Sequence, residues 1–129
     1  MNYLCLVYLA HDQLHASPDN VCFAYAQELY ASGHFVAGHA LQPVETATTI
    51  RIRNGQVSLT DGPFAETKEQ LVGFYLIQAK DLNEAIHWAS KIPPARYGSV
   101  EVRPVRALDV ANDDVTATSA TVALKNLGV

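Results

Sequence analysis

Two segments of the chain are apolar on both of their alternating faces, and they constrain the fold more than any other feature. Residues 3–9 (YLCLVYL) and residues 72–79 (VGFYLIQA) are rich in residues that favour β-strands. A strand that is apolar on both faces has to be covered on both faces. We therefore predict that these two strands lie side by side in the interior of a sheet.

Helical spacing of apolar residues predicts two helices. The first runs over residues 18–32, where Ser17 and Pro18 suit a helix start and Gly33 suits its end. The second begins after Asp81, with Glu84 three residues later, which is a variant of the capping box. A strand over residues 35–41 follows the first helix, and the prolines at positions 93 and 94 close the second.

A β-hairpin is predicted over residues 47–60. Ile50 and Ile52 alternate with arginines, and Val57 and Leu59 alternate with polar residues. The Asn-Gly pair at positions 54 and 55 separates the two runs, and it is the typical sequence of a tight turn with positive φ. The turn DGPF at 61–64 comes next, and residues 65–70 (AETKEQ) suggest one helical turn.

The order β-α-β, hairpin, β-α-β predicts an α+β, ferredoxin-like fold with an inserted hairpin. The last strand, residues 100–105 (VEVRPV), holds Pro104, which lacks a ladder donor and belongs at an edge. Two helices cover only one face of an antiparallel sheet. The other face keeps apolar side chains of both central strands, so we expect a homodimer through this open face.

Composition narrows the classes of partner and compartment. Hydrophobic residues make up 49% of the 129 residues and charged residues 17%, which suits one globular domain. The net charge of −4 and the absence of a run of basic residues disfavour binding to nucleic acid. No apolar run reaches the ~20 residues of a membrane span. For the cysteines at 5 and 22 we favour unpaired thiols of a cytoplasmic protein over a single disulfide. No cofactor or metal motif is present.

Three stretches of the chain resemble the DGPF-domain branch of the YCII-related family. They are residues 32–43 (SGHFVAGHALQP), residues 46–77 (TATTIRIRNGQVSLTDGPFAETKEQLVGFYLI) and residues 100–105 (VEVRPV). The resemblance covers about residues 1–107 and implies a dimeric α/β barrel type of fold, leaving residues 108–129 as an arm or a tail. Genes of this branch often neighbour extracytoplasmic-function sigma factors, which implies a signalling role.

Shorter members of this family carry a His in the first helix and an Asp after the second, proposed as an active-site pair. The matching positions here hold Val21 and Ile92. An enzyme hypothesis that rests on that pair therefore fails for this chain, and whether the protein is an enzyme at all stays open.

Two titratable residues remain as catalytic candidates. Asp61 suits a general base, and it equally suits a turn whose backbone amides donate to its carboxylate; we favour this structural role. His39, next to a glycine on a strand, is a candidate because histidine is the side chain most often used as an acid or base in proteins, although a structural histidine is the more common finding.

Four further residues are candidate ligand contacts. Arg51 and Arg53 share one hairpin face and suit an anion, with a solvated strand face as the alternative. Phe64 lies in the DGPF turn. Tyr75 lies on a central strand, where core packing is the alternative.

Three alternative hypotheses about function follow from these observations. The first is a small-molecule-binding or regulatory module with its pocket between the sheet and the DGPF turn. The second is an enzyme of the lyase or isomerase kind that moves protons through Asp61 or His39. The third is a protein-interaction partner, linked to sigma-factor signalling by the resemblance. A pocket that buries Asp61 favours the enzyme, and a pocket without titratable groups favours binding. A flat exposed apolar patch outside the dimer interface favours the third function.

Overall fold

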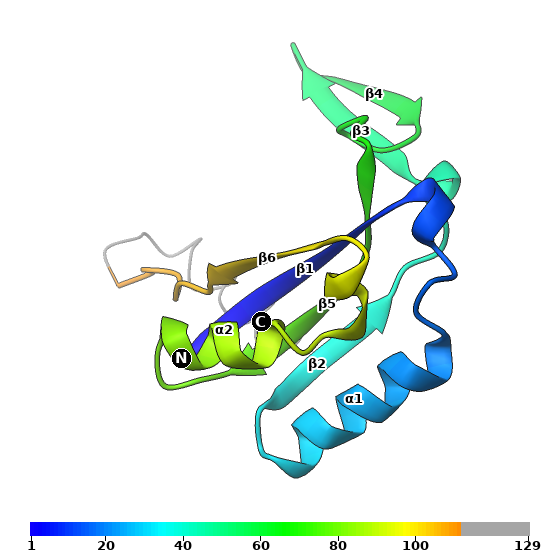
Figure 1. Ribbon diagram of the computed structural model, residues 1–129. Helices are drawn as coiled ribbons and strands as arrows, with labels where there is room; N and C mark the ends of the chain where they lie inside the picture. Colours follow the sequence, from blue (N-terminus) through cyan, green and yellow to red (C-terminus); the bar gives the residue numbers. More distant parts are fainter. Residues whose placement is uncertain (112–129) are drawn as a thin grey trace.

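A four-stranded antiparallel sheet with two helices on one face forms the body of the protein (Figure 1). The computed structural model describes residues 1–111. The strand order is β2-β5-β1-β6, which is the ferredoxin-like order and confirms the predicted fold class; within residues 1–111 the sheet does not close into a barrel. The elements of this body are β1 (Asn2–Ala10), α1 (Asp19–Ala31), β2 (Phe35–Ala40), β5 (Glu69–Gln78), α2 (Leu82–Ala89) and β6 (Ser99–Pro104).

The pairing of β1 with β5 occupies the centre of the sheet, as predicted. Alternate residues of β1 point toward the helices, and all four of them are buried. They pack with side chains from both helices, so the core lies between the helices and one sheet face. This cluster includes Tyr3, Cys5 and Val7 of β1, Tyr25 and Leu29 of α1, Ile77 of β5, and Ala85 and Ala89 of α2.

The other face of the sheet carries the remaining apolar side chains of the central strands. Leu4 lies opposite Leu76, and Leu6 lies opposite Phe74, so all four point away from the helices. Tyr8 continues the row, and these side chains are half-buried by their neighbours in the sheet. No element of residues 1–111 packs over this face, which we call the open face.

The helix boundaries follow the sequence signals with one exception. The Asp81 carboxylate accepts a hydrogen bond from the backbone N–H of Glu84 at 2.9 Å, which confirms the predicted cap of α2. Gly33, with a φ of 80°, follows α1 and donates to the Tyr30 carbonyl at 3.0 Å. The predicted start of α1 is wrong in detail, because Pro18 occupies the N-cap position and the Ser17 hydroxyl makes no capping bond.

The hairpin forms a separate two-stranded sheet that projects from one end of the main sheet (Figure 1). It consists of β3 (Thr48–Arg53) and β4 (Gln56–Asp61). Asn54 and Gly55 have φ values of 51° and 74°, which confirms the predicted tight turn. One hairpin face exposes an apolar stripe whose side chains are 61% to 67% accessible: Ile50, Ile52, Val57 and Leu59.

The segment between the hairpin and the central strand contains no helix. Residues 65–68 form bends and loop, and β5 already begins at Glu69, so the predicted helical turn at 65–70 is wrong. Residues 69 and 70 instead pair with the end of β1, which extends the central ladder by two residues. None of the helices within residues 1–111 has the length and apolar character needed to span a bilayer. The alternating run at 116–124 lies outside the described residues.

Replacing Gly55 by valine should destabilise the hairpin. A β-branched residue resists the positive φ of this turn, so we expect a loss of about 1 kcal/mol or more in the free energy of unfolding, measured by urea denaturation. Ser58→Val is the matched control, because position 58 lies in a strand where a β-branched residue is favoured. Equal stability of the two variants would contradict the assignment of the turn.

Candidate functional site

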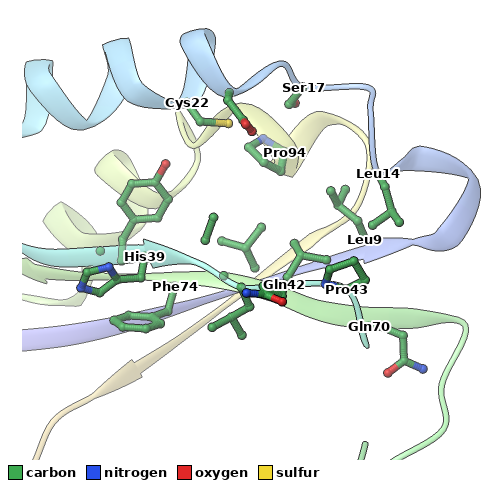
Figure 2. Close-up of a pocket in the computed structure, with 18 of the residues that line it drawn as sticks. Leu9, Leu14, Ser17, Cys22, His39, Gln42, Pro43, Gln70, Phe74 and Pro94 are labelled. Carbon is green, nitrogen blue, oxygen red and sulfur yellow. The ribbon is translucent and has the colours of Figure 1, made fainter. Parts of the chain in front are cut away.

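A cavity of about 530 Å³ lies between the sheet and α1 (Figure 2). It opens on the helix-covered side of the sheet, at the end where β1 finishes and β5 begins, and the segment after β2 forms one wall. Its volume falls in the range of about 300–1,000 Å³ that small-molecule sites usually show. The lining is largely apolar and includes Val7, Leu9, Leu14, Ala26, Phe35 and Val72.

The cavity does not lie where the sequence analysis expected it. Residues 61–64, the DGPF turn, are absent from its lining, so this cavity is not the pocket predicted between the sheet and that turn. The turn follows the hairpin, and the hairpin projects beyond the end of the sheet (Figure 1). The space beneath the first half of α1 forms the cavity instead.

Polar atoms gather on the α1 side of the cavity, which we call the roof. They belong to Ser17, which precedes α1, to Asp19 and Cys22 in its first turn, and to Tyr75, which reaches up from β5. Figure 2 shows the Ser17 and Cys22 side chains at this level, above the sheet. Sequence analysis selected only Tyr75, because Ser17 resembled a helix cap and Cys22 fell in the apolar stripe of α1.

Burial determines the protonation of the roof. It raises the pKa of the Tyr75 phenol to about 12, with a smaller contribution from Cys22. Burial also raises the pKa of the Cys22 thiol, and the negative charge of Asp19 adds to this effect. Both groups therefore keep their protons at neutral pH and are hydrogen-bond donors there, the thiol a weak one.

His39 contributes its backbone to the cavity, and its imidazole points to the opposite side of the sheet. The residue pairs with Phe74, which in turn lies opposite Leu6 of the open face. The two rings contact each other edge to face, with centroids 5.8 Å apart, and both are labelled in Figure 2. The His39 side chain is therefore separated from the roof by the sheet.

The remaining ligand candidates of the sequence analysis lie together on the hairpin. The Arg51 guanidinium lies over the Phe64 ring, 5.5 Å from its centroid, which is a cation–π contact. Arg53 is exposed and donates to the carbonyl of its neighbour Ile52 at 2.9 Å. The structure thus groups Arg51, Arg53 and Phe64 at a surface apart from the cavity and leaves Tyr75 alone inside it.

Asp61 is exposed at the end of β4, outside the cavity. The hydrogen bonds at the base of the hairpin run from the Gly62 amide to the Ala47 carbonyl at 2.7 Å and from the Thr49 hydroxyl to the Gly62 carbonyl at 2.9 Å. Among the described residues none donates to the Asp61 carboxylate, so the amide bonding expected for it is not found.

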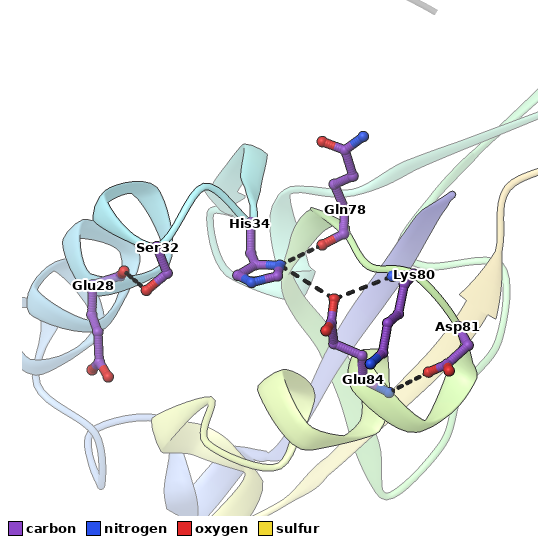
Figure 3. A network of polar contacts seen from close by, with 7 residues as sticks. All are labelled: Glu28, Ser32, His34, Gln78, Lys80, Asp81 and Glu84. Carbon is purple, nitrogen blue, oxygen red and sulfur yellow. Dashed lines mark hydrogen bonds and ion pairs between the residues drawn. The ribbon is translucent and has the colours of Figure 1, made fainter.

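A second polar cluster lies at the far end of the sheet (Figure 3). His34 Nδ1 donates to the Gln78 carbonyl at 2.7 Å and lies 3.7 Å from the Glu84 carboxylate, which also accepts the Lys80 amide proton at 3.1 Å. The His34 ring stacks on Trp88 with centroids 4.6 Å apart. These contacts join β2, β5 and α2. The cluster has a structural role, and within residues 1–111 no group of three metal-ligating side chains was found.

Comparison with known proteins gives a family and a fold. The sequence model of the YCII-related domain matches residues 1–109. The uncharacterised protein R00369 of Rhizobium meliloti (strain 1021) is 49% identical over 67 residues, which are 50% of this chain and 54% of that protein. The chain thus matches about half the length of this relative.

Among solved structures, the 5-chloro-2-hydroxyhydroquinone dehydrochlorinase TftG of Burkholderia phenoliruptrix AC1100, in complex with 2,5-dihydroxybenzoquinone, has a similar fold. The TM-score is 0.52 and the identity is 17%, over 88% of this chain and 100% of TftG. At this identity the likeness supports the fold class alone.

Removing the Asp61 carboxylate should barely change stability. The side chain is exposed and accepts no hydrogen bond from the described residues, so Asp61→Ala should alter the free energy of unfolding by no more than about 0.5 kcal/mol. Asp81→Ala is the contrasting control, because it deletes the cap of α2 and should cost about 0.5–2 kcal/mol. If Asp61→Ala lowered the free energy of unfolding as much as Asp81→Ala, this would support the predicted role of the Asp61 carboxylate as an acceptor of hydrogen bonds from the turn amides. Chemical denaturation of both variants decides this.

Proposed function

Since the chain belongs to the YCII-related family, whose model covers residues 1–109, we propose that it is a small-molecule-binding module whose ligand occupies the cavity beneath α1. The observation that carries this proposal is the cavity itself, which has the volume and the apolar lining of a ligand site. Burial of apolar ligand surface there supplies the binding free energy, at about 25 cal/mol per Å². The free thiols of Cys5 and Cys22 suit a cytoplasmic protein.

The enzyme hypothesis with Asp61 and His39 has less support. Asp61 lies on the hairpin, and the His39 imidazole lies on the open face, so neither side chain reaches the cavity or the other. A fold similar to that of a dehydrochlorinase is compatible with catalysis, but fold does not imply function. The DGPF branch, with its link to sigma factors, remains a hypothesis from the resemblance.

Naphthalene is a suitable probe of the cavity, because it is apolar and carries no hydrogen-bonding group. At tenfold excess over its Kd it should stabilise the protein by about 1.4 kcal/mol, a rise in melting temperature of several degrees by circular dichroism. Ala26→Phe should abolish this rise, because position 26 lines the cavity and a phenyl ring fills the space.

Ala24→Phe is the matched control on the same helix. Position 24 is exposed and does not line the cavity, so this variant should keep the full response to naphthalene. No stabilisation of the unmodified protein, or an equal loss in both variants, would contradict ligand binding beneath α1.

We also propose that two copies associate through their open faces. Leu4, Leu6 and Tyr8 of β1 and Leu76 of β5 form an apolar centre, which Glu101 and Arg103 of β6 flank on one edge. An apolar centre with a charged margin is the usual composition of a protein interface. Two-fold symmetry would bring each apolar centre onto the other and cover both.

The exposed stripe of the hairpin offers a competing interface, and it is the feature that favours an interaction partner. A single experiment separates the two surfaces. Light scattering should give twice the 14.0 kDa chain mass for the unmodified protein. Leu6→Asp, on the open face, should give the monomer mass, because it would bury an unpaired charge in the interface.

Leu59→Asp, on the hairpin stripe, is the matched control and should leave the dimer intact. Dissociation by Leu59→Asp and not by Leu6→Asp would move the interface to the hairpin. A monomeric unmodified protein would contradict the homodimer. Circular dichroism of each variant verifies that its fold is retained.

A further inference from the structure

Two hydroxyl groups of the cavity roof have no hydrogen-bond partner among the described residues. The Ser17 Oγ is buried and unpaired. The Tyr75 hydroxyl likewise takes part in none of the hydrogen bonds of residues 1–111, whereas the neighbouring buried Tyr25 donates its proton to the Trp88 carbonyl. Buried polar groups in proteins are nearly always paired, and one left unpaired is costly. The roof therefore has unused hydrogen-bonding capacity that a ligand can satisfy.

The two hydroxyls differ in their access to the cavity. Burial keeps the Tyr75 phenol protonated, so it donates to an oxygen placed under the roof. Ser17 also lines the cavity, but its Oγ is inaccessible, so the Tyr75 hydroxyl is the one that a ligand can reach. A ligand carbonyl or hydroxyl oxygen can accept a hydrogen bond from Tyr75.

The charges around the roof disfavour an anionic ligand. Asp19 lines the cavity, and its charge is close enough to Cys22 to oppose ionisation of the thiol. The side chains of Asp19, His11 and His15 in the lining are all exposed to solvent. A carboxylate under the roof would lose its hydration next to a carboxylate of the protein.

We propose that the cavity selects neutral ring compounds that carry one carbonyl or hydroxyl oxygen, held by the Tyr75 hydroxyl. This inference rests on the proposed function and adds the chemical class of its ligand. The apolar lining takes the ring, and the roof distinguishes an oxygenated ring from a plain hydrocarbon of the same size. Discrimination of this kind is strong, because an unmatched ligand leaves the polar groups of the site unpaired.

Three probes of similar size test the proposal by isothermal titration calorimetry on the full chain: naphthalene, 2-naphthol and 2-naphthoate. We expect 2-naphthol to bind about tenfold more tightly than naphthalene, which corresponds to one hydrogen bond gained. 2-Naphthol is the less hydrophobic of the two, so this gain does not arise from burial of apolar surface. 2-Naphthoate should bind more weakly than 2-naphthol.

Tyr75→Phe assigns the effect to one oxygen atom. It should weaken binding of 2-naphthol by about fivefold to tenfold and leave that of naphthalene within about twofold, since only the hydroxyl is removed. Tyr30→Phe is the control, because Tyr30 is exposed on α1 outside the cavity, and it should bind all three probes as the unmodified protein does.

The outcomes separate this inference from the proposed function. If naphthalene binds and 2-naphthol binds no more tightly, the roof does not select oxygen, while ligand binding in the cavity stands. If Tyr75→Phe weakens naphthalene and 2-naphthol equally, its hydroxyl is not the donor, and the inference fails. Tighter binding of 2-naphthoate than of 2-naphthol also overturns it. If none of the probes binds, the proposed function fails as well.

Discussion

The antiparallel pairing of β1 with β5 is the constraint on which the rest of the structure depends. Both strands are apolar on both faces, so they are stable only where material lies above and below them. The ladder runs from Asn2 opposite Gln78 to Ala10 opposite Glu69, the full length of the sheet. This central position leaves the edges to β2 and β6, whose residues are more exposed and, in β6, include a proline.

The two faces of this strand pair differ: helices cover one of them, and within residues 1–111 the other is uncovered. On one face α1 and α2 supply Tyr25, Leu29, Ala85 and Ala89, and these side chains form a continuous core with the strands. The eight residues of α2 cover less of the sheet than the thirteen of α1. Beneath the first half of α1 the helix–sheet space is incompletely filled, and this gap is the cavity. The other face has no cover within residues 1–111, which is why a second copy is the occupant that we propose for it.

Burial beneath α1 determines the protonation of two groups that line the cavity. Burial keeps both the Tyr75 phenol and the Cys22 thiol neutral, and Asp19 supplies the one nearby negative charge of the lining. A site of this kind can hold and orient a neutral oxygen. Its lining holds a single carboxylate, and its His11 and His15 side chains are exposed to solvent. This composition is why binding is better supported than catalysis.

Local chemistry allowed much of the fold to be predicted from the sequence. Asn54 and Gly55 form their turn because their own backbone preferences allow a positive φ. Asp81 begins α2 because its carboxylate accepts a hydrogen bond from Glu84, only three residues later. The two strands that are apolar on both faces are stable only in the centre of a sheet. Topology followed from the order of these elements. Of the residues assigned to a site, Tyr75 alone places its side chain in the cavity, because its strand position faces the helices.

Tertiary structure decided the rest, since it depends on contacts that no local pattern records. Counting by twos from Phe35 puts His39 on the helix side, but a bulge between Phe35 and Ala37 shifts the register and turns its imidazole to the open face. Serine often caps helices, but the Ser17 hydroxyl makes no capping bond to α1. Packing instead buries this hydroxyl on the α1 side of the cavity. The sequence by itself thus determined the strands, the turn and the topology, while packing between elements far apart in the chain determined which polar atoms meet in the cavity.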